Sequence, residues 1–167
     1  MRTLAFALLA IAAPAGAMAA QPPATWYAEA PKDAPTTLSY IDPATGKMTL
    51  RLTCARGSGQ VTSEYALNGR QADHQEAGVW VDGSGVRAPW PATVVFSSMG
   101  LSANLRGLMQ ADAATGASVA TGEISTRSPL MEAFARSGQI SLAAKGETIA
   151  PPPAPMSLVR RFLGPCR

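Results

Sequence analysis

Hydrophobic and polar positions alternate most clearly between Lys47 and Leu67. This period of two predicts two β-strands joined by a turn at Arg56-Gly57-Ser58-Gly59, where the glycines permit positive φ. With Gly57 and Ser58 as a two-residue turn, Arg51 faces Glu64 across the hairpin, because polar positions then pair with polar ones. The apolar positions share the other face: Met48, Leu50, Leu52, Cys54, Val61, Tyr65 and Leu67.

A second hairpin is predicted around the turn Asp82-Gly83-Ser84-Gly85, between the apolar segments 79–81 and 86–90. Its register places Val81 opposite Val86 and Trp80 opposite Arg87, so that the indole and the guanidinium can stack. Trp80 and Arg87 are therefore a candidate partner contact, since Trp and Arg are frequent at binding hot spots. The alternative is that another strand covers Trp80, because large aromatic side chains seldom stay exposed.

Toward the end of the chain, the period with which apolar residues recur changes from two residues, typical of a strand, to nearly four, typical of a helix. Segment 93–97 predicts a strand, whereas 101–116 has both periods and stays ambiguous. A short helix is predicted over 129–137, with Ser128 as its N-cap, Pro129 at its first position and Gly138 as its stop. Segment 140–144 predicts a further strand.

A closing helix is predicted after the Pro-rich run 151–155, with Ser157 as its N-cap. Its buried stripe consists of Leu158, Val159, Phe162 and Leu163. These elements together predict a mostly β protein with two short helices. The architecture is an antiparallel β-sandwich or a partly open barrel, closed by the C-terminal helix.

The first residues have the pattern of a secretory signal peptide: a charged start at Arg2, an apolar run, and small residues before Ala20. We expect residues 1–19 to be a signal peptide, 20–35 an extended Pro- and Ala-rich arm, and 36–167 a single β-rich domain. No cysteine follows the leader for lipidation, and no second apolar run is long enough to span a bilayer. The expected location is the periplasm, as a soluble protein that is not lipidated.

Charge is low and evenly spread over the mature sequence. Once Arg2 leaves with the leader, about thirteen basic residues face 11 acidic ones, and like charges form no run. This balance argues against nucleic acid or an anionic membrane as the main partner.

Two cysteines, Cys54 and Cys166, remain in an oxidising compartment. A redox-active pair would need the spacing Cys-x-x-Cys, which the chain lacks. A zinc site would need four ligands, whereas the chain has two thiols and one histidine. A structural disulfide between Cys54 and Cys166 is therefore expected.

The single histidine, His74, lies with Asp73 and Glu76 in the polar segment 68–78. Such a cluster can hold a metal ion or act as a base, and it can equally be part of a solvated loop. No Gly-x-Ser-x-Gly elbow and no phosphate-binding glycine loop is present. We expect neither a cofactor nor a catalytic residue.

One segment resembles a known family. The sequence from Leu130 to Leu142, followed by an extended segment and the closing stretch Phe162-Leu163-Gly164-Pro165-Cys166, is similar to the end of small exported proteins. These are the invasion-associated locus B proteins and the periplasmic accessory proteins of type VI secretion. The resemblance is confined to this last part of the chain, implies a small β-rich periplasmic domain, and transfers no functional residue.

The expected function is that of an exported, non-catalytic binding or structural protein of the bacterial cell envelope, with an envelope protein or other periplasmic partner. The alternative is a small periplasmic hydrolase or metal-dependent enzyme that uses Asp73, His74 and Glu76. The histidine decides between them, because an enzyme of this kind depends on it.

Overall fold

The structure, a computed structural model, describes residues 25–113 and 115–167. The predicted signal peptide, residues 1–19, lies outside the described residues. The strands are β1 Thr25–Glu29, β2 Thr36–Ile41, β3 Met48–Cys54, β4 Gln60–Ala66, β5 Ala72–Glu76, β6 Val79–Asp82, β7 Trp90–Ser98, β8 Leu101–Ala111, β9 Ser118–Ser125, β10 Ser141–Ala144 and β11 Glu147–Ile149. The helices are α1 Pro129–Ser137, α2 Met156–Leu163 and the 3-10 turn η1 Gly164–Cys166.

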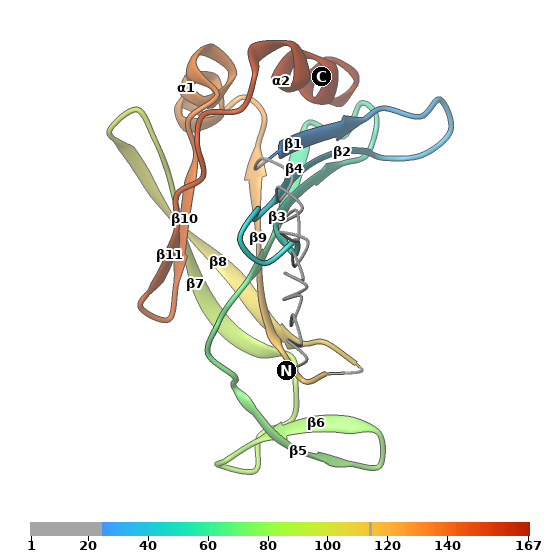
Figure 1. The fold of residues 1–167 in the computed structure, drawn as a ribbon, viewed down its shortest axis with the longest axis vertical. Helices are drawn as coiled ribbons and strands as arrows, with labels where there is room; N and C mark the ends of the chain where they lie inside the picture. Colours follow the sequence, from blue (N-terminus) through green and yellow to red (C-terminus); the bar gives the residue numbers. More distant parts are fainter. Residues whose placement is uncertain (1–24, 114) are drawn as a thin grey trace, which may run out of the picture.

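Within the described residues, nine strands form one antiparallel sheet that curls into a half-barrel (Figure 1). Their order is β1-β2-β3-β4-β9-β8-β7-β10-β11, and β5 pairs with β6 in a small separate sheet. The prediction of a mostly β fold with two helices is confirmed, and of its two architectures the partly open barrel is the one observed. The sheet has two free ends, β1 and β11, because the half-barrel does not close.

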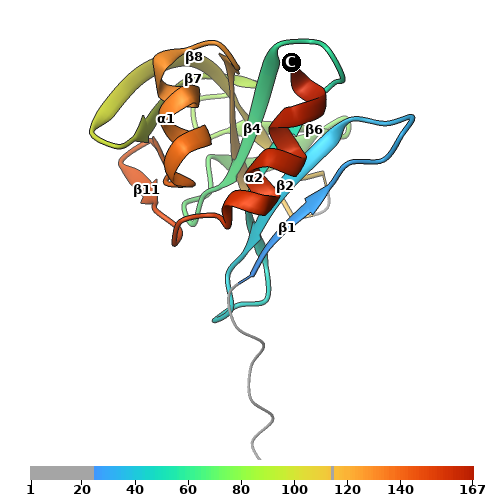
Figure 2. The ribbon, with the colours of Figure 1, turned by 90° about the horizontal axis from the view of Figure 1, so that it is seen from above.

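The core lies where the inner face of the half-barrel meets the two helices. Alternate positions of the long strands point inward and are buried, among them Leu50, Leu52, Phe96 and Leu142. Helix α2 packs against β1 and β2, and α1 packs against β7 and β8, so the helices cover both wings of the sheet (Figure 2). Burial of these apolar side chains is the main favourable term in folding.

The first predicted hairpin is confirmed in register. Leu50 lies opposite Tyr65 and Arg51 opposite Glu64, with 3.7 Å between the guanidinium and carboxylate atoms. Two details differ from the prediction. The turn closes from Ser58 N to the Ala55 carbonyl, and Met48 is exposed because the register of β3 against β2 shifts near its start.

Part of the extended arm predicted over 20–35, Thr25–Glu29, is edge strand β1, which pairs with β2. Trp26 anchors it: the indole is buried against Tyr40, and its Nε1 donates to the Pro152 carbonyl at 2.8 Å. That partner is 126 positions away in the chain, so local composition could not reveal it. The ambiguous segment 101–116 contains the long strand β8.

Helix α1 has the predicted boundaries and caps. The Ser128 side chain accepts from Met131 N, and Gly138 ends the helix in the left-handed conformation. Helix α2 begins at Met156, two residues earlier than a Ser157 N-cap predicts. Its N-cap is Pro155, without a side-chain hydrogen bond, so the prediction of Ser157 as the cap is wrong. Neither helix is long and apolar enough to cross a membrane, as far as the described residues go.

The predicted disulfide joins Cys54 to Cys166, and both cysteines are buried. It connects the end of β3 to the last turn of the chain. Two backbone hydrogen bonds accompany it, from Gly57 N to Pro165 O and from Gly59 N to Cys166 O, each 2.9 Å. The β3–β4 loop and the C-terminal segment are therefore held together both covalently and by hydrogen bonds.

Candidate functional site

The two residues of the predicted partner contact do not face each other. Strand β6 pairs with β5, and the residue opposite Arg87 is Val81 rather than Trp80. The predicted register is therefore shifted by one position, and the predicted stacking is wrong. One residue of slip moves a side chain to the other face of a strand.

Trp80 instead lies partly buried beneath Arg70, whose guanidinium carbon is 4.8 Å from the indole centroid. A Cβ on Gly116 would meet both the indole and the Arg70 guanidinium at 2.9 Å, so the β8–β9 connection packs closely against this pair. Arg87 is exposed and its nearest acid is Glu76, at 3.9 Å. Trp80 thus has a packing role, and the two residues form no common surface patch through stacking.

The predicted Asp73-His74-Glu76 cluster forms, on strand β5 rather than in a loop. Nδ1 of His74 lies 3.1 Å from Asp73 Oδ2, and Nε2 lies 3.2 Å from Glu76 Oε1. The hydrogen bond to Glu76, followed by that to Asp73, raises the pKa of His74. Both ring nitrogens are thus occupied by carboxylates, which favours the protonated imidazolium at the surface.

No group of three or more His, Cys, Asp or Glu is arranged to hold a metal ion in the part of the chain that the structure describes. Asp73, His74 and Glu76 are largely exposed, with side-chain exposures of 67%, 50% and 53%. A solvated ion-pair cluster of this kind contributes little to stability.

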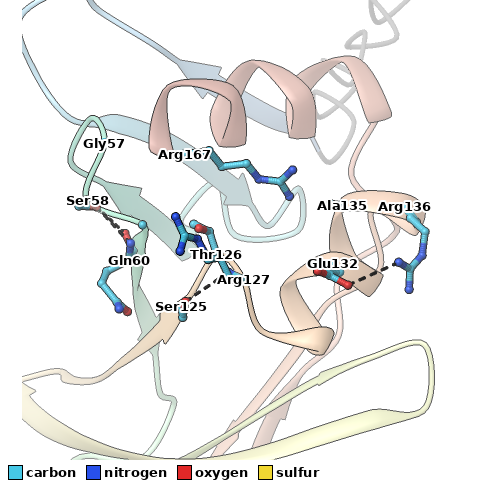
Figure 3. Close-up of a pocket in the computed structure, with 11 residues that line it drawn as sticks. Gly57, Ser58, Gln60, Ser125, Thr126, Arg127, Glu132, Ala135, Arg136 and Arg167 are labelled. Atoms are coloured by element: carbon cyan, nitrogen blue, oxygen red, sulfur yellow. Dashed lines mark hydrogen bonds and ion pairs between the residues drawn. The ribbon is translucent and has the colours of Figure 1, made fainter.

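A pocket of about 620 Å³ lies where the β3–β4 loop, the end of β9, helix α1 and the last residue meet (Figure 3). Segment 57–60 forms one wall and 125–127 continues it, with Thr126 N donating to Gly59 O at 2.8 Å. Arg136 on α1 and Arg167 complete the lining. We call this the arginine pocket, after its three basic residues: Arg127, Arg136 and Arg167.

The charge around the arginine pocket is unbalanced. Three guanidinium groups line it against one acidic side chain, Glu132, which lies 4.0 Å from Arg136 on the same helix. Among the described residues, Arg127 and Arg167 have no acidic side chain within salt-bridge distance. In Figure 3, Arg167 projects over the opening, with Arg127 on one side and Arg136 on the other. The pocket therefore has a positive potential.

Thr126 adds a polar group to the same place. The residue is 2% exposed and lines the pocket, and its Oγ1 has no hydrogen-bond partner among the described residues. A buried hydroxyl without a partner destabilises the protein unless a ligand or water satisfies it. Guanidinium groups donate in a planar fork that matches carboxylate and phosphoryl oxygens. The arrangement is suited to binding an anion, and the described residues that line it include no nucleophile activated by a base.

The arginine pocket was not predicted from the sequence. From the sequence, segment 57–59 is identifiable only as part of a turn. Its three arginines are spread from position 127 to 167, so no sequence motif groups them. They meet because the disulfide places Cys166, and with it Arg167, beside the β3–β4 loop.

No family model, no curated protein and no solved structure matches the chain. The similarity of the C-terminal segment to the invasion-associated locus B and type VI accessory proteins therefore stays a prediction.

Proposed function

We propose that this protein is an exported, non-catalytic binding protein of the bacterial cell envelope, and that the arginine pocket binds an anionic group of its partner. The observation that carries the proposal is the presence of three guanidinium groups from separate segments around one pocket with a single acidic side chain. Arginine is favoured for this task because it stays charged and binds oxyanions through two parallel hydrogen bonds.

The pocket is preorganised for such a contact. The disulfide and the two hydrogen bonds from the β3–β4 loop fix the wall formed by Gly57 and Gly59 against the C-terminal segment. Binding to a wall that is already ordered loses little conformational entropy. The partner group is a carboxylate or a phosphoryl group, since both present oxygens that match the guanidinium fork.

The test compares two variants that remove the same charge. Arg127→Gln with Arg167→Gln changes the pocket, whereas Arg106→Gln with Arg161→Gln removes two exposed arginines that do not line it. The probes are inorganic phosphate, citrate and a short Asp- and Glu-rich peptide, titrated while the backbone amide resonances of the pocket are followed by NMR.

We expect at least one probe to shift the resonances of Gly57, Gly59 and Thr126, with affinity falling about 10-fold or more in the pocket variant, the scale of one lost charge-assisted hydrogen bond. The control variant should keep native affinity. An equal loss in both variants, or no response to any probe, contradicts the assignment of the pocket.

The enzyme alternative is tested in the same experiment series. His74→Ala should leave capture of the envelope partner unchanged if the protein acts by binding. Loss of function in folded His74→Ala, together with full function in the pocket variant, would instead favour chemistry at Asp73, His74 and Glu76. Cell fractionation of the tagged protein tests the periplasmic location.

A further inference from the structure

A second hollow, of about 370 Å³, opens between the two wings of the half-barrel. Its lining comes from β2, β3 and β4 on one side and from β11 and the residues after it on the other. Residues of β2 and of β11, which lie toward opposite ends of the sheet and on separate sides in Figure 1, thus line the same hollow. Barrel mouths are frequent sites for small ligands. We call it the tyrosine pocket, after Tyr40 and Tyr65.

Glu147 fixes the two walls of the tyrosine pocket relative to each other. Its Oε2 accepts a hydrogen bond from Asn68 N, and its Oε1 accepts one from Gly69 N, both at 2.7 Å. These two backbone N–H groups, first that of Asn68, lower the pKa of Glu147. The carboxylate is therefore ionised at neutral pH, and its remaining lone pairs are available to a ligand.

Two hydroxyl groups at this pocket have no hydrogen-bond partner among the described residues: Tyr65 Oη and Thr49 Oγ1. Tyr65 is 2% exposed, and its burial, followed by the charge of Glu147, raises its pKa to about 12. The phenol is thus neutral at physiological pH. Unpartnered buried hydroxyls are rare in folded proteins, and two at one pocket point to a group that satisfies them when it binds.

The charge of the tyrosine pocket is opposite to that of the arginine pocket. Its charged lining residues are Asp42 and Glu147, and no Lys or Arg of the described chain lines it. Asp42 is held in place by Ala44 N at 2.9 Å and by the Thr45 hydroxyl at 3.1 Å. The rest of the lining includes the two tyrosines and the apolar side chains of Ile149 and Pro151. Oxygen acceptors, negative charge and aromatic rings form one small cavity.

We propose that the tyrosine pocket binds a small organic amine in its ammonium form. The three N–H groups of the ammonium donate to the Glu147 carboxylate and to the hydroxyl oxygens of Thr49 and Tyr65. Asp42 adds a second negative charge at the same pocket, and the carbon chain packs on the aromatic rings. A neutral polyol would leave the two negative charges without a counterion. Both hydroxyls have almost no contact with solvent, so the amine reaches them only after side chains at the rim rotate. This site is independent of the arginine pocket.

The probes are 1,4-diaminobutane and, as its uncharged counterpart of equal length, 1,4-butanediol. Each is titrated into the full mature protein while the amide resonances of Thr49, Tyr65, Asn68 and Gly69 are followed by NMR. We expect the diamine to shift these four resonances and the diol to leave them unchanged. Equal binding of the diol would overturn the ammonium assignment, and no response to either probe up to millimolar concentration would overturn the site.

Three variants separate ligand binding from structural effects. Tyr65→Phe removes only the unpartnered hydroxyl, so we expect a melting temperature at least equal to native together with diamine affinity lowered by about 3- to 10-fold. Glu147→Gln keeps an amide oxygen for one backbone N–H and removes the charge, and it should lower affinity by about 10-fold or more. Glu123→Gln, an exposed acid on β9 away from the pocket, is the matched control and should bind normally.

The diamine affinities of these variants can either support or overturn the proposed amine site. Loss of affinity in Tyr65→Phe with unchanged stability supports the site even if Glu147→Gln fails to fold. An equal loss in Glu123→Gln would show a general effect of charge and overturn it. If Tyr65→Phe binds the diamine with native affinity, the Tyr65 hydroxyl does not contact the ligand and the proposed geometry is wrong.

Discussion

Gly138→Ala is expected to destabilise the protein far more than the same change at Gly146. Both glycines have positive φ, 69° at Gly138 and 82° at Gly146, a conformation that alanine adopts only with strain. They differ in their surroundings. A Cβ on Gly146 meets nothing within 4 Å, whereas a Cβ on Gly138 overlaps the backbone carbonyl oxygen of Ala154.

The expected loss in free energy of unfolding is the sum of the cost of the left-handed backbone conformation and the cost of the contact made by the new Cβ. The left-handed conformation costs an L-residue about 1 to 2 kcal/mol, which is the whole effect expected at Gly146. At Gly138 the backbone of 154 must also move away, which breaks the hydrogen bond from Ala154 N to Gly138 O, 2.9 Å in the native protein. Losing that bond adds about 1 kcal/mol, and disturbing the buried Ala154 methyl adds a similar amount. The expected total at Gly138 is about 3 to 4 kcal/mol.

Thermal or chemical unfolding of the two variants measures this difference. At about 2 to 4 °C for each kcal/mol in a domain of this size, Gly146→Ala should lower the melting temperature by about 4 to 5 °C and Gly138→Ala by about 10 °C. Gly146→Ala is the matched control, since it has the same φ penalty without the clash. Equal losses in the two variants would refute the reasoning, because they would show that contact between α1 and the segment before α2 contributes nothing.

Three further predictions concern the Cys54–Cys166 disulfide, His74 and the signal peptide. Cys54→Ser and Cys166→Ser should lose the same stability, about 4 to 5 kcal/mol in the chain-entropy model for a bond spanning 112 residues, and equilibrium unfolding of both variants checks this. His74 should titrate above its usual pKa by NMR, mainly through its hydrogen bond to Glu76, and Glu76→Gln should lower that pKa. Because the folded pKa is raised, the small stabilisation from His74 is present below its unfolded pKa of 6.5 and is lost as pH rises through the folded pKa. Intact-mass measurement of the exported protein should give a chain that begins at Ala20 within a residue or two, and a mass that retains the leader would contradict export.

The β3–β4 hairpin and helix α1 could be derived from the sequence because their determinants are local. A shift of one residue in the hairpin would place Glu64 on the same face as the apolar residues of β3, so alternation alone selects the register. Helix α1 has its cap, its first-turn proline and its stop glycine within eleven consecutive residues. The disulfide was predicted from the two cysteines together with the expected export of the protein to an oxidising compartment.

Pairing choices with two local solutions needed the tertiary structure. Strand β6 has a turn on each side, at Ala77-Gly78 and after Asp82, and both turns contain positive φ. Both neighbouring segments pair with it: β5 along its length, and the segment after Asp82 through the Val81–Arg87 bridge and the hydrogen bond from Ala88 N to Trp80 O. The sequence pattern indicated the second pairing, one position out of register, and missed the first. Strand β1 was hidden in a Pro- and Ala-rich segment, because the Trp26 side chain that anchors it binds a carbonyl 126 positions away.

Both candidate pockets also depend on tertiary structure alone. The arginines of the first pocket and the two walls of the second come from segments far apart in the chain, and no local pattern indicates that they meet. Curling of the sheet brings β11 opposite β2 to β4, and the disulfide brings Arg167 to the β3–β4 loop. Side-chain periodicity reports which face of a strand is buried, but not which distant strand or helix end it will face.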